Sequence, residues 1–176
     1  MSFCDYFKQY IHDPADSIRD KHVFYRIDDW YDEVKNTEKE LGITIPEELK
    51  EIYKELGYGF LCASDDNFCV NRIMPPTELV DFYLGRDIYE FNEVREDYAD
   101  SHYNLNCGKL VFFEQDSDFF LTVGLTPDDQ GRYPVDALGQ KIADSVQEFL
   151  MKMDKKQIII LICSLMNISL IDCMPA

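Results

Sequence analysis

The segment from Leu41 to Gly59 constrains the fold of this chain most, because it predicts a short helix with defined ends. Pro46 favours an extended residue before it and suits the first helical position. Glu47 and Glu48 follow in the first turn, where the positive end of the helix dipole stabilises carboxylates. The apolar positions recur at the spacing of one helical face: Leu49, Ile52, Tyr53 and Leu56. The segment therefore predicts a helix that packs on the domain with one side and ends at a glycine.

Short strands are predicted after this helix, separated by turn-forming residues. The predicted strands cover residues 58–63, 68–74, 109–114, 119–125 and 132–138. The other predicted helices cover residues 28–41, 77–84, 87–100 and 141–153. Helices before and after a run of short strands favour an α+β fold over a wound parallel sheet. We therefore expect a single α+β domain, with an antiparallel sheet of short strands flanked by N-terminal helices and a C-terminal helix.

The first strand pair has a defined register if Ser64–Asn67 forms a four-residue loop. Ala63 would then face Phe68, and Cys62 would face Cys69. Directly opposed cysteines lie close enough to form a disulfide on oxidation.

The length of 176 residues favours one domain. We divide the chain into an N-terminal leader (residues 1–27), the domain itself (residues 28–153) and an apolar tail (residues 154–176). The leader has an aromatic stripe at helical spacing, which we expect to cover the core. His12 and His22 are expected at the surface.

The chain is strongly acidic, with 34 Asp and Glu residues against 17 Lys and Arg residues and a net charge of −17. Nucleic-acid backbones repel such a surface, so direct binding of nucleic acid is disfavoured. Attraction of a basic protein partner is the functional interpretation of this charge. Solubility alone is the simpler one.

Motifs for catalysis and metal binding are not found. The cysteines form no Cys-x-x-Cys pair, and the histidines show no metal-ligand spacing, so we expect no metal and no cofactor. The one candidate dyad, His102 with Cys107, has only its proximity in sequence to support it. Met1–Tyr10 lacks the apolar core of a secretion signal. We therefore expect a non-enzymatic, cytoplasmic protein with reduced thiols.

Carboxylates are most concentrated between Asp87 and Asp100, where Arg95 is the only basic residue. On one continuous helix, a single face would carry Glu90, Glu93, Asp97 and Asp100. A neighbouring apolar face would carry Phe91, Val94 and Tyr98. The acidic face is either a solvated surface or a docking site for a basic partner. Two predicted turns add the aspartate pairs Asp65–Asp66 and Asp128–Asp129 to the candidate partner-binding residues.

Two further features have open alternatives. Trp30 is the only tryptophan and is either a core anchor or a hot spot for a partner. Residues 157–171 carry no charge and are nearly all apolar. A bilayer span needs about 20 apolar residues, so a membrane anchor is disfavoured. Otherwise the tail packs on the domain or on a second copy as a homodimer, or it is foreign to the fold.

The chain resembles the SUKH superfamily over roughly residues 28–153. The matching positions are Trp30, Glu38, Leu41–Gly42, Ile45–Pro46, Leu49–Lys50, Tyr53 and Gly57–Gly59. The exit Gly57-Tyr58-Gly59 departs from the Asn-Gly-Gly usual in that family.

This resemblance implies a bacterial immunity protein that neutralises a toxin, often a nuclease. Acidic side chains would occlude a basic active site by standing where substrate phosphates bind. The alternative is a cytosolic scaffold or regulator that binds proteins without blocking a catalyst.

Overall fold

The computed structural model describes residues 2–14, 21–62, 70–100, 103–116 and 118–155, with only the backbone described at 99 and 100. The α-helices are α1 (Trp30–Leu41), α2 (Glu47–Glu55), α3 (Pro76–Leu84), α4 (Glu93–Asp100) and α5 (Val146–Asp154). The 3-10 helices are η1 (Phe3–Tyr10), η2 (Asp87–Tyr89) and η3 (Leu105–Cys107). The strands are β1 (His22–Tyr25), β2 (Tyr58–Leu61), β3 (Arg72–Ile73), β4 (Lys109–Asp116), β5 (Phe119–Gly124), β6 (Val135–Ala137) and β7 (Gln140–Ala143).

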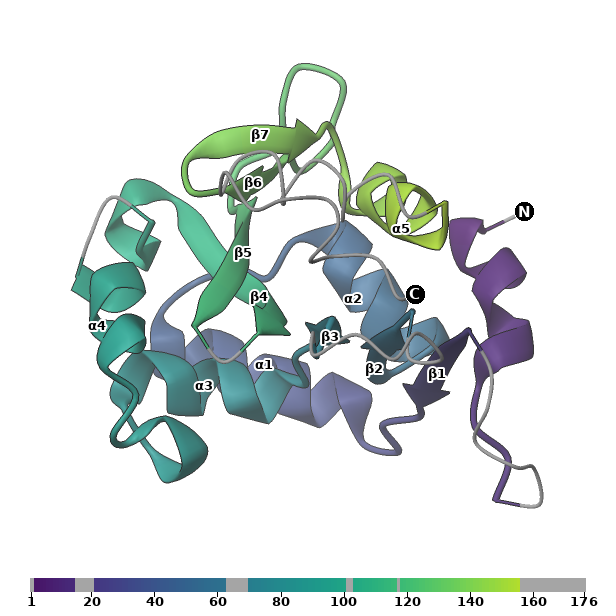
Figure 1. The fold of residues 1–176 in the computed structure, drawn as a ribbon, viewed down its shortest axis with the longest axis horizontal. Coiled ribbons are helices and arrows are strands. Elements are labelled where there is room, and N and C mark those ends of the chain that lie inside the picture. Colours follow the sequence, from purple (N-terminus) through teal and green to yellow (C-terminus); the bar gives the residue numbers. More distant parts are fainter. Residues whose placement is uncertain (1, 15–20, 63–69, 101–102, 117, 156–176) are drawn as a thin grey trace, which may run out of the picture.

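The strands form one seven-stranded sheet in sequence order, and each strand is antiparallel to the next. Figure 1 shows this curved sheet, with α4 at one end of the molecule and η1 at the other. The fold is therefore α+β, as the order of predicted helices and strands indicated.

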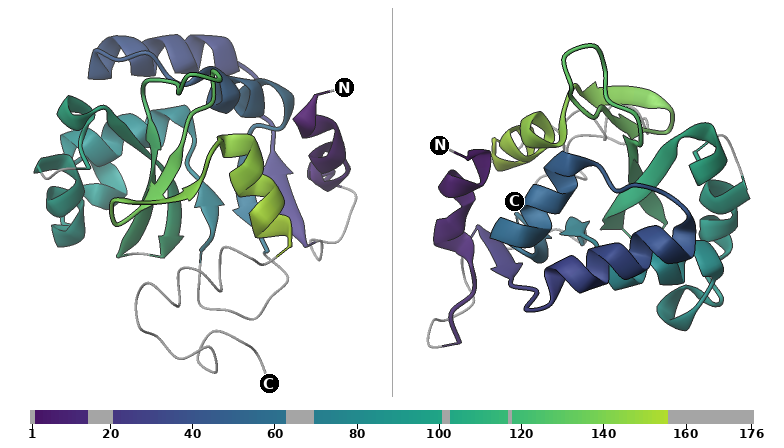
Figure 2. Two further views of the ribbon diagram at one scale, coloured as in Figure 1. Left: turned by 90° about the horizontal axis from the view of Figure 1, so that it is seen from above. Right: turned by 180° about the vertical axis from the view of Figure 1, so that it is seen from behind.

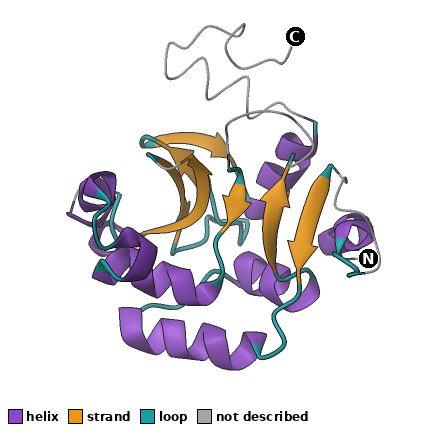
Figure 3. Ribbon diagram, turned by 60° about the horizontal axis from the view of Figure 1, so that its bottom comes forward, coloured by secondary structure: helices purple, strands orange, loops and turns teal. Residues whose placement is uncertain are grey.

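Helices cover both faces of the sheet (Figure 3). Phe113 of β4 packs edge-on against Phe149 of α5, with ring centroids 5.0 Å apart. Phe120, which pairs with Glu114 across the β4–β5 ladder, packs against Phe82 of α3 at 4.8 Å. Neighbouring residues of a strand point to opposite faces, so α3 and α5 lie on opposite sides. Aromatic rings, which bury large apolar areas, contribute to the core on both sides.

The prediction for α2 is confirmed. All four residues of its predicted stripe are buried, and the Tyr53 hydroxyl donates to the carbonyl of Met74 at 2.9 Å. Pro46 is the residue before the helix rather than its first residue. Gly57 has φ +92°, and a Cβ there would overlap the Tyr25 backbone, so glycine is required where α2 leads into β2.

The prediction of one helix over residues 141–153 is wrong at its start. Gln140–Ala143 forms β7, and α5 begins only at Val146 after the N-cap Ser145. The Ser145 hydroxyl accepts the N–H of Glu148 at 2.9 Å. Ile142 is buried from the sheet rather than from a helix.

Glu48 of α2 completes the N-terminus of α5. Its carboxylate accepts the Val146 N–H at 2.6 Å and also bonds to the backbone N–H groups of Gln147 and Tyr133. Burial raises the pKa of the Glu48 carboxyl, and these backbone hydrogen bonds oppose the rise. The first N–H groups of α5, which lack partners within the helix, are thus satisfied from a distant part of the sequence.

In the described part of the first strand pair, the register is shifted by one residue from the predicted one. Gly59 pairs with Ile73 and Phe60 pairs with Arg72. The Leu61 N–H donates to the Asn71 carbonyl at 2.8 Å. Cys62 is buried, whereas Cys69 lies outside the described residues. The predicted pairing of Cys62 with Cys69 therefore lies outside the described residues.

The prediction that His22 lies at the surface is also wrong. It begins β1, a strand within the expected leader that the sequence did not predict, and it is fully buried. Its Nδ1 accepts the Cys62 N–H at 3.1 Å, and its Nε2 lies 3.0 Å from the Asp154 carboxylate. An imidazole that accepts at Nδ1 carries its proton on Nε2, so His22 links β2 to the end of α5. Figure 2 shows η1 beside β1. The ring of Phe7 in η1 packs edge-on against the His22 ring, with centroids 5.7 Å apart.

The tail prediction, residues 157–171, lies outside the described residues. Among the helices that the structure does describe, no helix has the length and apolar character needed to cross a bilayer.

The capping of α5 by Glu48 makes a testable prediction. Glu48→Ala should lower the free energy of unfolding by about 1–3 kcal/mol, because it leaves buried N–H groups without acceptors. Glu48→Gln keeps an acceptor and should cost less. Chemical denaturation of both variants and the wild type measures this difference.

The pH dependence provides a second readout. A carboxyl whose pKa is raised by folding weakens the fold as the pH rises from its unfolded to its folded pKa. Glu48→Gln removes this loss, so its stability relative to wild type should increase with pH across that window. Equal stabilities of the alanine and glutamine variants at every pH would contradict the capping role.

Candidate functional site

We name residues 87–98 the acidic projection. It consists of η2, the connection 90–92 and α4 up to Tyr98. It lies at the end of the molecule away from η1 and α5 (Figure 1). The exposed carboxylates of this segment are Asp87, Glu90, Glu93, Glu96 and Asp97.

The projection is not the continuous helix that the sequence predicted. Asp87 has φ +49°, a left-handed conformation that cannot continue a helix. Asn92 then starts a new helix, because its side-chain oxygen accepts the Arg95 N–H at 3.0 Å. Glu90 therefore precedes α4 and does not share its face with Glu93 and Asp97.

Tyr89 fixes η2 to the domain. Its side chain is 2% exposed, and its hydroxyl lies 3.3 Å from the Arg72 guanidinium and 3.4 Å from the Glu78 carboxylate. Arg72 also binds Glu78 through two nitrogens and Glu114 at 2.6 Å. Burial raises the pKa of the Tyr89 hydroxyl, which stays a neutral hydrogen-bonding group.

Tyr89 points into the domain, whereas the apolar residues near it in sequence, Ile88 and Phe91, are exposed to solvent. Ile88 is 62% exposed and Phe91 is 88% exposed. The predicted grouping of Phe91 with Tyr98 on one apolar helix face is therefore wrong. In contrast, Tyr98 is buried, and its hydroxyl accepts the Phe120 N–H at 3.2 Å. The projection thus combines two tyrosine anchors with exposed apolar side chains.

Arg95, the only basic residue of the projection, turns away from its carboxylates. Its guanidinium donates to the carbonyls of Phe82 at 3.2 Å and Tyr83 at 3.4 Å, near the end of α3. The same group lies 3.1 Å from where a Cβ on Gly85 would stand, and Gly85 has φ +62°. Arg95 is therefore engaged by the negative end of a helix dipole, and the outer surface of the projection remains acidic.

The other predicted site residues are distributed differently. Asp100 belongs to α4, but only its backbone is described, and Asp65 and Asp66 lie outside the described residues. Asp128 and Asp129 lie in the turn before β6, on a different part of the molecule from the projection. Of the predicted site residues whose side chains are described, Glu90, Glu93 and Asp97 belong to the projection.

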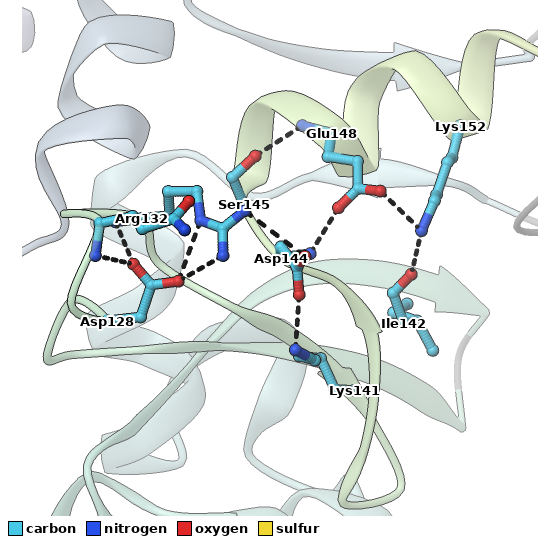
Figure 4. Close-up of polar contacts among 9 residues, drawn as sticks. Asp128, Arg132, Lys141, Ile142, Asp144, Ser145, Glu148 and Lys152 are labelled. Carbon is cyan, nitrogen blue, oxygen red and sulfur yellow. Dashed lines mark hydrogen bonds and ion pairs between the residues drawn. The ribbon is translucent and has the colours of Figure 1, made fainter.

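Asp128 forms ion pairs within the protein, in a cluster next to the N-terminus of α5 (Figure 4). It accepts from the Arg132 side chain at 2.7 and 2.9 Å and from the backbone of Gln130 and Arg132. The Arg132 side chain and then its backbone N–H lower the pKa of Asp128 to about 2. The charge of Asp128 is thus compensated within the turn, whereas Asp129 is exposed.

A second concave surface lies between α1 and α2. This cleft has a volume of about 640 Å³, and half-buried Trp30 lines it while also packing against the core. Its walls carry both signs of charge, since Lys50 pairs with Glu38 at 2.9 Å and with Glu47 at 3.0 Å. Within the described residues, the projection is therefore the more uniformly acidic of the two surfaces.

Sequence reasoning missed Ile88, Phe91 and Asp118 as surface features. Asp118, in the β4–β5 turn, lines a hollow together with the projection. The sequence Phe-Asn-Glu could have predicted that Phe91 precedes the helix, because asparagine is a strong N-cap residue. No group of three or more metal-ligating side chains occurs among the residues that the structure describes.

Comparisons with known proteins agree with the resemblance seen in the sequence. The model of the SMI1 / KNR4 family (SUKH-1) matches residues 30–152. Immunity protein YxxD of Bacillus subtilis (strain 168) is 33% identical over 123 residues, which are 70% of this chain and 78% of that protein. No solved structure matches. With a family model that spans α1 to α5, this chain belongs to the SMI1/KNR4 (SUKH-1) family.

Proposed function

We propose that this chain is an immunity protein that binds a cognate bacterial toxin and blocks its active site. The observation that carries this proposal is the acidic projection, whose only basic side chain faces the protein interior. The relative named as an immunity protein supports the same role. The complex would form in the cytoplasm.

The charge of the chain indicates the chemistry of the partner. A net charge of −17 raises the encounter rate with a basic protein by electrostatic steering. A nuclease is such a protein, because its active site must bind phosphates. Carboxylates of the projection would occupy the positions of those phosphates and exclude the substrate.

Inhibition can be tested with toxin domains encoded beside the gene for this chain. Each domain is purified and assayed for nuclease activity with increasing amounts of this protein. We expect activity to fall to zero at equimolar protein for the cognate toxin and to stay unchanged for a toxin from another system. Tight binding without inhibition would support the scaffold alternative instead.

The role of the acidic projection makes a kinetic prediction. Replacing Glu90 and Glu93 by glutamine and Asp97 by asparagine should slow association with the toxin about tenfold at low salt. The dependence of the association rate on salt should also become weaker, because exposed charges act through screened long-range attraction. Stopped-flow association at several salt concentrations measures both effects.

A matched control separates local charge from net charge. Replacing Asp28, Asp29 and Asp32 by asparagine removes the same charge from exposed positions at the start of α1. This control should change the association rate much less. Equal rates for both triple variants would mean that the projection has no special role in docking.

A further inference from the structure

A hollow lies against the exposed ring of Phe91. Its volume is about 520 Å³, and its lining residues are Ile88, Phe91, Asn92, Glu93, Val94 and Asp118. These side chains come from η2, from the beginning of α4 and from the turn between β4 and β5. The hollow therefore joins two parts of the chain that are distant in sequence.

The lining combines apolar and acidic groups. Ile88, Phe91 and Val94 supply apolar surface, and Glu93 and Asp118 supply carboxylates. Neither carboxylate has a hydrogen-bond or ion-pair partner in the described part of the chain. Asn92 is engaged in capping α4.

Phe91 is unusual among the phenylalanines of this protein. At 88% exposure, it is the one exposed phenylalanine among those that the structure describes. The tyrosines on either side of it are buried, so the ring is held outward by a fixed segment. Exposed apolar side chains with a polar rim are typical of protein interaction sites.

An arginine side chain has the chemistry that complements this lining. Its aliphatic part can cover Ile88 and Val94, and its guanidinium can bind Glu93 and Asp118. The guanidinium also binds the faces of aromatic rings such as Phe91 and is more weakly hydrated than an ammonium group. An anionic group would be repelled, and a neutral one would leave two carboxylates without partners in a closed interface.

We propose that this hollow is the receptor site for an arginine side chain of the partner protein. The inference rests on the proposed function, since it names the feature of the toxin that the acidic projection recognises. Phe91 and the two carboxylates are then a binding hot spot, surrounded by steering charges such as Glu90 and Asp97. The hollow determines how long the complex lasts, whereas the outer carboxylates determine how fast it forms.

The first experiment measures binding to the catalytically inactive form of the neighbouring toxin domain. The variants are Phe91→Ala and the pair Glu93→Gln with Asp118→Asn. Each should weaken binding by about 30-fold or more, mainly through faster dissociation. The pair Asp28→Asn with Asp32→Asn removes the same charge at α1 and should weaken binding less than about threefold.

Thermal unfolding of each variant confirms that the fold is kept, as expected for side chains at the surface. On the toxin, each surface arginine is replaced by lysine. Replacing the arginine that occupies the hollow should weaken binding of the toxin to the wild-type protein. The same replacement should not weaken binding to the carboxylate double variant any further. If the wild type binds the toxin and the hollow variants lose no more affinity than the control, the arginine site is overturned. The proposed function would then still stand.

A second experiment needs no toxin. The wild-type protein is titrated with the peptide acetyl-Gly-Arg-Gly-amide and with its citrulline analogue, which has nearly the same shape but no charge. Amide resonances of residues 88–94 and 118 should shift in nuclear magnetic resonance spectra with the arginine peptide only. Equal shifts with both peptides, or none at these residues, would overturn the proposal. Absence of wild-type binding to any toxin would count against the proposed function alone.

Discussion

The position of the acidic projection depends on the hydrogen bonds and ion pairs of the Arg72 guanidinium. From β3 it binds Glu114 of β4, Glu78 of α3 and the hydroxyl of Tyr89 in η2. Burial opposes the charge of Arg72, but the hydrogen bonds and charges of Glu114 and Glu78 raise the pKa of its guanidinium. Removing one partner of such a cluster would leave an uncompensated charge with little access to water. The cluster therefore locks the sheet, α3 and η2 into one arrangement.

This lock explains why a segment rich in carboxylates is ordered at all. Like charges repel, and residues 87–98 carry five carboxylates against one arginine. Tyr89 reaches the Arg72 cluster, Tyr98 reaches β5, and Arg95 binds the carbonyls near the end of α3. These three contacts fix the backbone of the segment to the domain. The outward side chains are therefore not needed to hold the segment in place.

The sequence predicted the fold where periodicity and turn residues agree. The stripe of α2 and the β4–β5 hairpin are correct because apolar spacing there has one structural solution. Periodicity alone could not locate the start of α5, since Ile142 is buried in either structure; the Ser145–Glu148 cap was the available signal. It also could not reveal the break between η2 and α4, because the Asn92 cap that starts the new helix leaves hydrophobic spacing unchanged. The hollow was beyond prediction, because Asp118 reaches it only through the tertiary fold.

The separation of inner anchors from outer side chains also bears on how such a protein can diverge. Ile88, Glu90 and Phe91 contribute little to the core, so mutations there change the chemistry of the surface at small cost in stability. Selection can then act on partner choice at these positions while Tyr89, Tyr98 and Arg95 keep the scaffold intact. A lineage that must follow a changing partner would accumulate substitutions in this outer layer first. Such a history would appear as differences between close relatives at positions 88, 90, 91, 93 and 118, with the two tyrosines unchanged.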